Sequence, residues 1–171
     1  LINILKQWAA AHPEAALRYA SQMQDRATVA QIMPSLLQGM ASVYPDLALN
    51  TALALPQDPA RDKALVNIAT NWASKDPVKS SAQILALPES NERTSMLAGT
   101  GAVWAYTNPA AASTWAQSLP VSPARDTVLA AVADTLSTTH PEIATANAQG
   151  ISDASMRAKA LAKIASKKGG S

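Results

Sequence analysis

The chain has 171 residues, of which 48% are hydrophobic and 15% are charged, and its net charge is +2 at pH 7. This composition supplies ample material for a core, and so small a charge argues against a broad nucleic-acid footprint. There is no cysteine, which excludes disulfides and thiolate metal sites and leaves the compartment undetermined between oxidising and reducing. No apolar run of about 18 residues occurs, so no membrane-spanning helix is predicted.

Prolines recur every 32 residues along the chain, at Pro13, Pro45, Pro77, Pro109 and Pro141. A leucine column keeps the same step at Leu65, Leu97, Leu129 and Leu161. An arginine column keeps it as well, at Arg61, Arg93, Arg125 and Arg157. A fixed period of this length, without insertions, is the signature of a helical or solenoid array.

Residues 1–12 correspond to the end of a repeat unit. Ile4 and Trp8 lie one repeat period before Leu36 and Met40, which are in the second half of the next unit. We therefore expect a partial N-terminal unit that lacks its first helix. The uncovered apolar positions of Leu1–Trp8 predict either fraying or end-to-end self-association.

Unit 13–44 departs most from the pattern. It has Val29 where later units have arginine, although Arg26 lies one helical turn earlier. Pro34 falls inside its second helix and is expected to kink that helix or to delay its start.

Unit 45–76 is regular and predicts a helical hairpin. Pro45 suits the first position of a helix, and Pro56 stops that helix. Asp58-Pro59 then provides a cap and a second start. The longer second helix is expected to bury a broad apolar face made of Ala64, Leu65, Ile68, Ala69 and Trp72.

The run Asp58-Pro59-Ala60-Arg61-Asp62-Lys63-Ala64-Leu65, followed by Asp76-Pro77, resembles the short HEAT-like repeat. That family has a similar turn, an early arginine in the second helix, and then alanine and leucine. The second helix here ends in tryptophan where the family often has glycine, and the Leu-Pro step is unusual. The resemblance implies a protein-binding scaffold.

The expected fold is all-α: a right-handed α-solenoid of five tandem 32-residue hairpins plus a partial N-terminal helix. We expect one array over 1–168, with a partial unit 1–12 and units 13–44, 45–76, 77–108, 109–140 and 141–168. Residues 169–171 are interpreted as an artificial linker.

Three features of the later units need interpretation. Asp76 and Asn108 are expected to cap helices. Gly99 and Gly101 are interpreted as close helix packing, because a nucleotide loop would need a preceding strand. The lysines spaced four apart in the last unit favour a solvating cap, with a basic patch for an acidic partner as the alternative: Lys159, Lys163 and Lys167.

No catalytic constellation is visible. His12 and His140 occupy the same column four units apart and are interpreted as helix caps. Asp58, Asp62 and Asp126 are interpreted as caps and surface charges. Because no groups converge, we expect no enzyme activity, no cofactor and no metal site.

The function expected from the sequence is a non-catalytic scaffold or adaptor that binds a protein or peptide. The binding face would be formed by the variable column beside the alanine stripe of the first helices, namely Tyr19, Thr51, Gln83, Trp115 and Asn147. For Tyr19 and Trp115 the alternative is that they fill gaps between units.

The arginine column is expected to be structural, with each guanidinium bonding loop carbonyls or a nearby aspartate. One alternative function is a nucleic-acid-binding repeat that uses this ladder, which the near balance of charges disfavours. Another is a non-catalytic domain of a larger enzyme.

Overall fold

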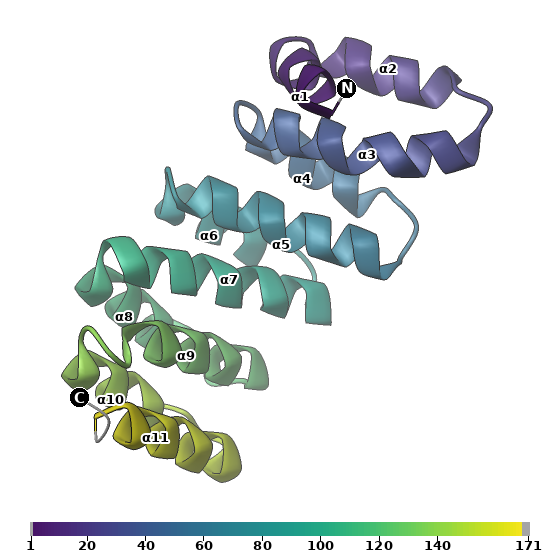
Figure 1. The fold of residues 1–171 in the computed structure, drawn as a ribbon. Helices are drawn as coiled ribbons and strands as arrows, with labels where there is room; N and C mark the ends of the chain where they lie inside the picture. The colour runs from purple at the N-terminus through teal and green to yellow at the C-terminus, as the bar shows by residue number, and fades with distance from the viewer. Residues whose placement is uncertain (1, 169–171) are drawn as a thin grey trace. The chain divides into compact units, whose positions relative to one another are not determined.

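The computed structural model describes residues 2–168, and every regular element in that range is an α-helix (Figure 1). Leu1 and the linker expected at 169–171 lie outside the described residues. The helices are α1 (Ile2–Ala11), α2 (Pro13–Gln22), α3 (Arg26–Ala41), α4 (Pro45–Leu53), α5 (Pro59–Ala73), α6 (Pro77–Leu85), α7 (Asn91–Thr107), α8 (Pro109–Ser118), α9 (Pro123–Leu136), α10 (Pro141–Gln149) and α11 (Ala154–Lys168).

Short and long helices alternate from α2 onward, as the proline pattern predicts. The short helices have 9 or 10 residues and the long ones 14 to 17. The all-α class is thus confirmed over the described residues, and the alternation is consistent with a helical repeat. The chain divides into two compact units, Leu1–Lys75 and Asp76–Ser171, which are described separately.

In the first unit, α3 packs against both α1 and α5, while α4 contacts α3 and α5. Gly39 makes the contact with α1 close, because a Cβ at this position would collide with the backbone of Lys6. Close approach of two backbones is a use of glycine that no other residue can serve. Pro34 neither ends α3 nor delays its start, since the helix runs from Arg26 to Ala41 through it.

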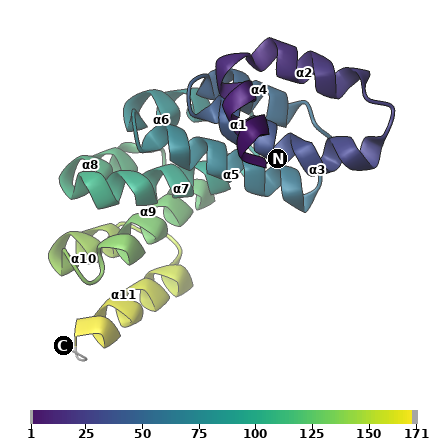
Figure 2. The same ribbon diagram turned by 45° about the horizontal axis from the view of Figure 1, so that its top comes forward.

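In the second unit, the long helices α7, α9 and α11 pack in succession, and the short helices α8 and α10 contact each other and the long helices (Figures 1 and 2). Gly101 serves close packing here as predicted. A Cβ on it would lie 3.1 Å from Trp115 and 3.2 and 3.3 Å from Val132 and Val128.

Prolines and caps set the helix starts. Asp58, Asp76, Asn108 and Ser122 each accept a hydrogen bond from the third residue of the helix that follows. His12 and His140 occupy the N-cap positions of α2 and α10, as predicted. Neither side chain makes a capping bond, and His140 Nδ1 pairs instead with Thr139 Oγ1 at 3.1 Å. Imidazole is not among the short oxygen-bearing side chains that reach the first-turn N–H groups.

The core follows the predicted columns, except that Ala64, which was expected in the buried face of α5, is half-buried. Leu65, Ile68, Ala69 and Trp72 are buried in α5, and Ala48 and Ala52 are buried in α4. The buried alanines of the short helices allow the long helices to approach them closely. None of the helices in the described range 2–168 has the length and apolarity needed to cross a lipid bilayer.

Candidate functional site

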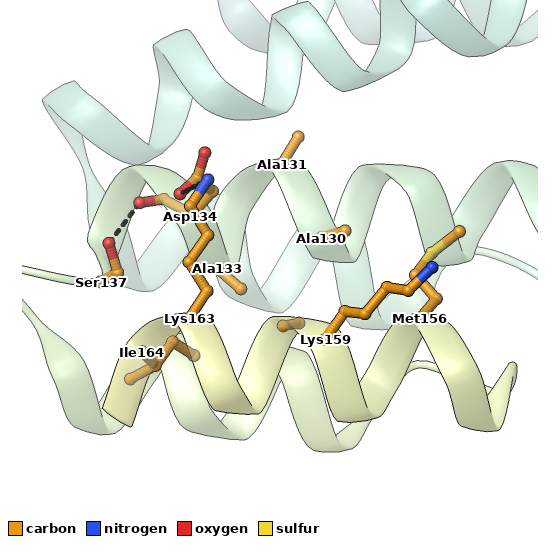
Figure 3. A pocket seen from close by; sticks show the side chains of 10 residues that line it. Ala130, Ala131, Ala133, Asp134, Ser137, Met156, Lys159, Lys163 and Ile164 are labelled. Atoms are coloured by element: carbon orange, nitrogen blue, oxygen red, sulfur yellow. Dashed lines mark hydrogen bonds and ion pairs between the residues drawn. The ribbon is translucent and has the colours of Figure 1, made fainter. Parts of the chain in front are cut away.

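A cleft of about 340 Å³ opens between α9 and α11 in the second unit (Figure 3). Its apolar lining comes from three alanines of α9 together with Met156, Ala160 and Ile164 of α11. Its polar lining consists of Asp134, Ser137, Lys159 and Lys163.

A second cleft, also of about 340 Å³, opens between α3 and α5 in the first unit. Pro34, Leu37 and Ile68 provide much of its apolar lining. Its polar lining consists of Gln38, Lys63, Asn67 and Asn71.

The two clefts occupy the same position in the 32-residue repeat. Pro34, Leu37 and Ile68 line the α3/α5 cleft. The residues at the equivalent positions three repeats later line the α9/α11 cleft: Ala130, Ala133 and Ile164. Lys63 corresponds in the same way to Lys159. The repeat therefore builds the same type of cleft twice. Each cleft lies between two consecutive long helices within one of the two compact units.

Three polar residues of the α9/α11 cleft, Asp134, Ser137 and Lys163, form a paired set with the nearby Lys167. Lys163 Nζ lies 2.8 Å from Asp134 Oδ1, and Lys167 Nζ lies 3.4 Å from the same oxygen and 2.8 Å from Ser137 Oγ. The hydrogen bond from Lys163, with the charges of both lysines, holds the pKa of Asp134 below its usual range against the opposing effect of burial. Figure 3 shows Lys163 reaching from α11 to Asp134, whereas Lys159 extends beside Met156.

In the α3/α5 cleft the corresponding positions carry carboxamides. Gln38 stands where the other cleft has Asp134, Asn67 where it has Lys163, and Asn71 where it has Lys167. The Oδ1 atom of Asn71 is buried and has no hydrogen-bond partner among the described residues. An unsatisfied buried acceptor costs about 1–3 kcal/mol, so it needs an explanation.

A separate, mainly apolar hollow of about 400 Å³ has wall residues in common with the α3/α5 cleft. Both share Pro34, Leu37, Ala60 and Ala64 as walls. Met23, Val29, Met33 and Leu55 add apolar surface, and the charged residues Arg26, Asp58 and Arg61 also line the hollow. Predominantly apolar hollows with a few polar groups are typical ligand sites.

The column predicted as the binding face is not uniformly accessible. Tyr19 is 50% exposed and its ring makes an edge contact with Trp8 at 5.5 Å. Gln83 is exposed and Thr51 is half-buried. Asn147 is fully buried, and its amide donates to Ser113 Oγ at 2.7 Å and to the Ile143 carbonyl at 2.8 Å.

Trp115, the fifth member of that column, is half-buried. Its ring lies 5.5 Å from that of Trp104 at an interplanar angle of 35°. Its edge also faces Gly101, where a Cβ would lie 3.1 Å from Cζ3. Trp115 therefore packs between α8 and α7 while keeping part of its surface in solvent.

The guanidinium groups of the arginine column donate to backbone carbonyls. Arg61 Nε donates to Ala52, and Arg93 donates to Ile84 and Leu85, with distances of 3.1 to 3.3 Å. Arg125 and Arg157 make the same kind of bond, to Gln117 and Gly150 and to Ile151 and Ser152 respectively. The accepting carbonyls lie in the last turns of α4, α6 and α8 or in the segment that follows α10.

Asp126 is not a surface charge, contrary to prediction, because it is only 2% exposed. Its carboxylate accepts from the Ser152 N–H at 2.8 Å, the Ser152 hydroxyl at 2.6 Å and the Asp153 N–H at 2.9 Å. The sequence carries a signal for this arrangement. The position of Ser152 is proline in three earlier units, and only a residue with an N–H can donate to a carboxylate there.

Among residues 2–168 no group of three or more His, Cys, Asp or Glu side chains is placed to hold a metal ion. The carboxamides of the α3/α5 cleft were missed by the sequence analysis. Their signal was a comparison of repeat columns, in which an Asp–Lys–Lys set is replaced by Gln–Asn–Asn.

No family model matches this chain, and no curated protein or solved structure does.

Proposed function

We propose that this chain is a non-catalytic scaffold or adaptor module that binds a protein or peptide, built as a HEAT-like right-handed α-solenoid of five hairpins. The observation that carries the proposal is the pair of equivalent clefts between consecutive long helices. Each combines apolar walls with hydrogen-bonding side chains, which is the mixture that binds peptide segments. The regular alternation of short and long helices supports the repeat architecture.

Two surfaces are available to a partner. The face of the short helices, expected from Tyr19, Thr51, Gln83, Trp115 and Asn147, offers the exposed Tyr19 in the first compact unit and the exposed Gln83 in the second. The clefts between the long helices offer deeper surface. We assign the binding role first to the clefts, because binding energy concentrates in pockets that exclude water.

The nucleic-acid alternative would use the arginine column to contact phosphates. The guanidinium groups are engaged by carbonyls of the fold, and the side chain of Arg61 is 9% exposed. Retention of single-stranded RNA or duplex DNA at low salt would favour this alternative, because phosphate contacts are strongest there. Membership of a larger enzyme as a non-catalytic domain is compatible with the same peptide-binding role.

The proposal is tested by panning random peptides displayed on phage against the folded chain. Selected peptides are then measured against Tyr19→Ala with Gln83→Ala, and against Gln38→Ala with Asn67→Ala. All four residues are exposed, so the variants should keep the fold, which circular dichroism checks. Weakened binding to the second pair assigns the α3/α5 cleft, and weakened binding to the first pair assigns the short helices. Failure to enrich any peptide above an unrelated helical protein rejects the proposed function.

A further inference from the structure

In three of the later units an arginine of the arginine column bonds the last turn of the short helix that precedes it. The accepting carbonyls belong to two neighbouring repeat positions, which in α2 are occupied by Ala20 and Ser21. The first position accepts from Arg61 Nε at Ala52 and from Arg93 Nε at Ile84, both at 3.3 Å. The second accepts from Arg93 Nη2 at Leu85, at 3.1 Å, and from Arg125 Nη2 at Gln117, at 3.4 Å.

The first unit lacks this arginine, because Val29 stands at its repeat position. Valine has no group that can donate a hydrogen bond, and the last turn of α2 contains no basic residue. Among residues 2–168 the Ser21 carbonyl accepts no hydrogen bond, and the Ala20 carbonyl accepts only from the Met23 N–H, at 3.3 Å. The acceptors are therefore kept in α2, while the donor that meets them elsewhere is missing.

Arg26 lies one helical turn before Val29 but does not take over this role. Its side chain is exposed, and within the described part of the chain it makes no hydrogen bond to the carbonyl of Ala20 or Ser21. Nothing in the first unit therefore supplies the guanidinium that the later units have.

The missing side chain leaves open space beside an apolar column. Ala20, Val29 and Met33 line the mainly apolar hollow of about 400 Å³, which we call the Val29 hollow. Met33 is half-buried, whereas the leucines at its repeat position are at most 2% exposed: Leu65, Leu97 and Leu129. An arginine stem covers apolar surface while its head stays polar, so its loss uncovers this column.

The charges around the Val29 hollow are compatible with a cationic guest. The free carbonyls at the end of α2 carry the negative end of the helix dipole, and the acidic Asp58 also lines the hollow. Arg61 is another lining residue, but its guanidinium already bonds Ala52 and lies 3.4 Å from Asp62.

The second compact unit shows that two arginines are tolerated at these repeat positions. Arg93 stands at the position of Val29, and Arg125 stands at the position of Arg61. Both are half-buried and bonded to carbonyls in α7 and α9 of one fold. A guanidinium beside Val29 would therefore repeat an arrangement that this chain already contains.

We propose that the Val29 hollow binds an arginine side chain of a partner protein. The guanidinium donates to the carbonyls of Ser21 and Ala20, and the aliphatic stem lies against Val29 and Met33. The partner thereby supplies the side chain that the repeat omits in its first unit. This inference rests on the proposed function and specifies a site and the chemistry of its ligand.

The test uses the whole chain with ¹³C-labelled methyl groups and the probes acetyl-Ala-X-Ala amide, in which X is arginine, norleucine or glutamate. Titration to about 10 mM covers the weak affinity of a single side chain. The arginine probe should shift the methyl signals of Val29, Met33 and Leu55 saturably. The norleucine probe keeps an aliphatic stem without the guanidinium and should bind about tenfold more weakly. The glutamate probe, which would use Arg26 as its anchor, should bind no better than norleucine.

Val29→Arg supplies the missing arginine from the chain itself. It should raise the melting temperature and abolish binding of the arginine probe, because its own guanidinium takes the two carbonyls. Val29→Ile is the matched control and should retain most of the binding, because it adds no donor. If Val29→Arg does not fold, Ala30→Trp replaces it, since Ala30 is exposed and lines the same hollow.

Arg93→Val makes the reciprocal change in the second unit. It should create a second site for the arginine probe, seen as new shifts of the methyl signals of Leu87 and Leu97, which stand at the repeat positions of Met23 and Met33. If this variant does not fold, the comparison of Val29→Arg or Ala30→Trp with Val29→Ile still decides.

Equal binding of the arginine and norleucine probes overturns the inference, as does tighter binding of the glutamate probe. Unchanged binding of the arginine probe in the blocked variant, or the absence of any saturable shift, overturns it as well. Displayed peptides separate this failure from that of the proposed function. Enriched peptides that bind Val29→Arg as tightly as the parent chain remove the inference and keep the proposed function, whereas the absence of any enriched peptide rejects the proposed function.

Discussion

Asp126 on α9 accepts both the backbone N–H and the hydroxyl of Ser152, at 2.8 and 2.6 Å, across a separation of 26 residues. The next residue, Asp153, adds a third donor at 2.9 Å and itself accepts from the Met156 N–H at 2.6 Å. One carboxylate in α9 therefore fixes the turn from which α11 begins. Charge-assisted bonds of this kind are about twice as strong as neutral ones.

Ser152→Pro should destabilise the chain more than Ser152→Ala. Proline removes the N–H that Asp126 accepts and restores the residue found at this position in earlier units, whereas alanine removes only the hydroxyl bond. We expect losses in the free energy of unfolding of about 3 and about 1 kcal/mol. Urea unfolding measures both. Equal losses would show that the backbone bond contributes little.

The stability of the chain should fall in acid. Burial raises the pKa of Asp126, but the hydrogen bonds from Ser152 and Asp153 and the charge of Arg125 outweigh it, so the net pKa lies below its usual value. Hydrogen bonds also lower the pKa of Asp25, and Lys163 and Lys167 lower that of Asp134.

The direction of this pH dependence follows from the number of protons bound by the folded and the unfolded chain. A carboxyl with a lowered pKa in the folded state binds fewer protons there than in the unfolded chain, where its pKa is about 3.9. Its stabilising contribution is therefore complete above that value and is lost as the pH falls through the folded-state pKa. Urea unfolding from pH 7 to pH 2 should show a flatter decline for Asp126→Asn. Parallel curves would contradict a role for Asp126.

Gly39→Ala should release α1 from α3. Alanine favours a helix by about 1 kcal/mol over glycine, so the substitution would stabilise an isolated α3. In the fold, the new Cβ meets the backbone of Lys6, which cannot give way as a side chain can. We expect faster hydrogen exchange throughout 2–11. Gly101→Ala is the matched control, because its Cβ would meet only side chains and should cost less. Unchanged exchange in α1 would argue against the close contact.

Arg93→Ala should lower the melting temperature. Arg93 Nε and Nη2 donate to the carbonyls of Ile84 and Leu85 at 3.3 and 3.1 Å, and losing both bonds should cost about 2 kcal/mol. Arg93→Lys should recover only part of this, because an ammonium lacks the planar fork that meets two carbonyls. Differential scanning calorimetry compares the three proteins. An unchanged melting temperature with loss of a bound ligand would make the arginine column functional.

Trp115→Ala should lower stability by about 2–3 kcal/mol, because it removes the ring that packs on Trp104 at 5.5 Å and fills the space beside Gly101. Thermal unfolding without any peptide measures this. Trp115→Phe, which keeps an aromatic ring, should lose less. If Trp115→Ala instead unfolds like the parent and loses displayed peptides, Trp115 is a recognition residue.

Much of the helical arrangement could be predicted because the chain repeats its local signals. Pro45 and Pro59 start helices where they should, and Asp76 and Asn108 cap as expected, since these effects depend only on neighbouring residues. His12 and His140 take the N-cap positions that their column predicts, but whether an N-cap residue also bonds the first turn of its helix depends on side-chain geometry, which the column does not give.

The clefts could not be predicted from one unit read alone. Their walls come from consecutive long helices, so their character depends on pairs such as Gln38 with Asn67 that are far apart in sequence. The burial of Asp126 depends in the same way on Ser152. Asn147 shows the complementary difficulty: its column suggests an exposed side chain, but a polar residue can be buried when a partner such as Ser113 is present.

The arginine bonds have a consequence for the order in which the chain folds. Arg61 reaches a carbonyl 9 residues earlier, and Arg93 reaches carbonyls 9 and 8 residues earlier. Closing so short a loop costs little chain entropy, and proteins rich in local contacts fold fast. The turns before α5 and α7 can therefore form before more distant helices have met. Folding can then start within a single hairpin.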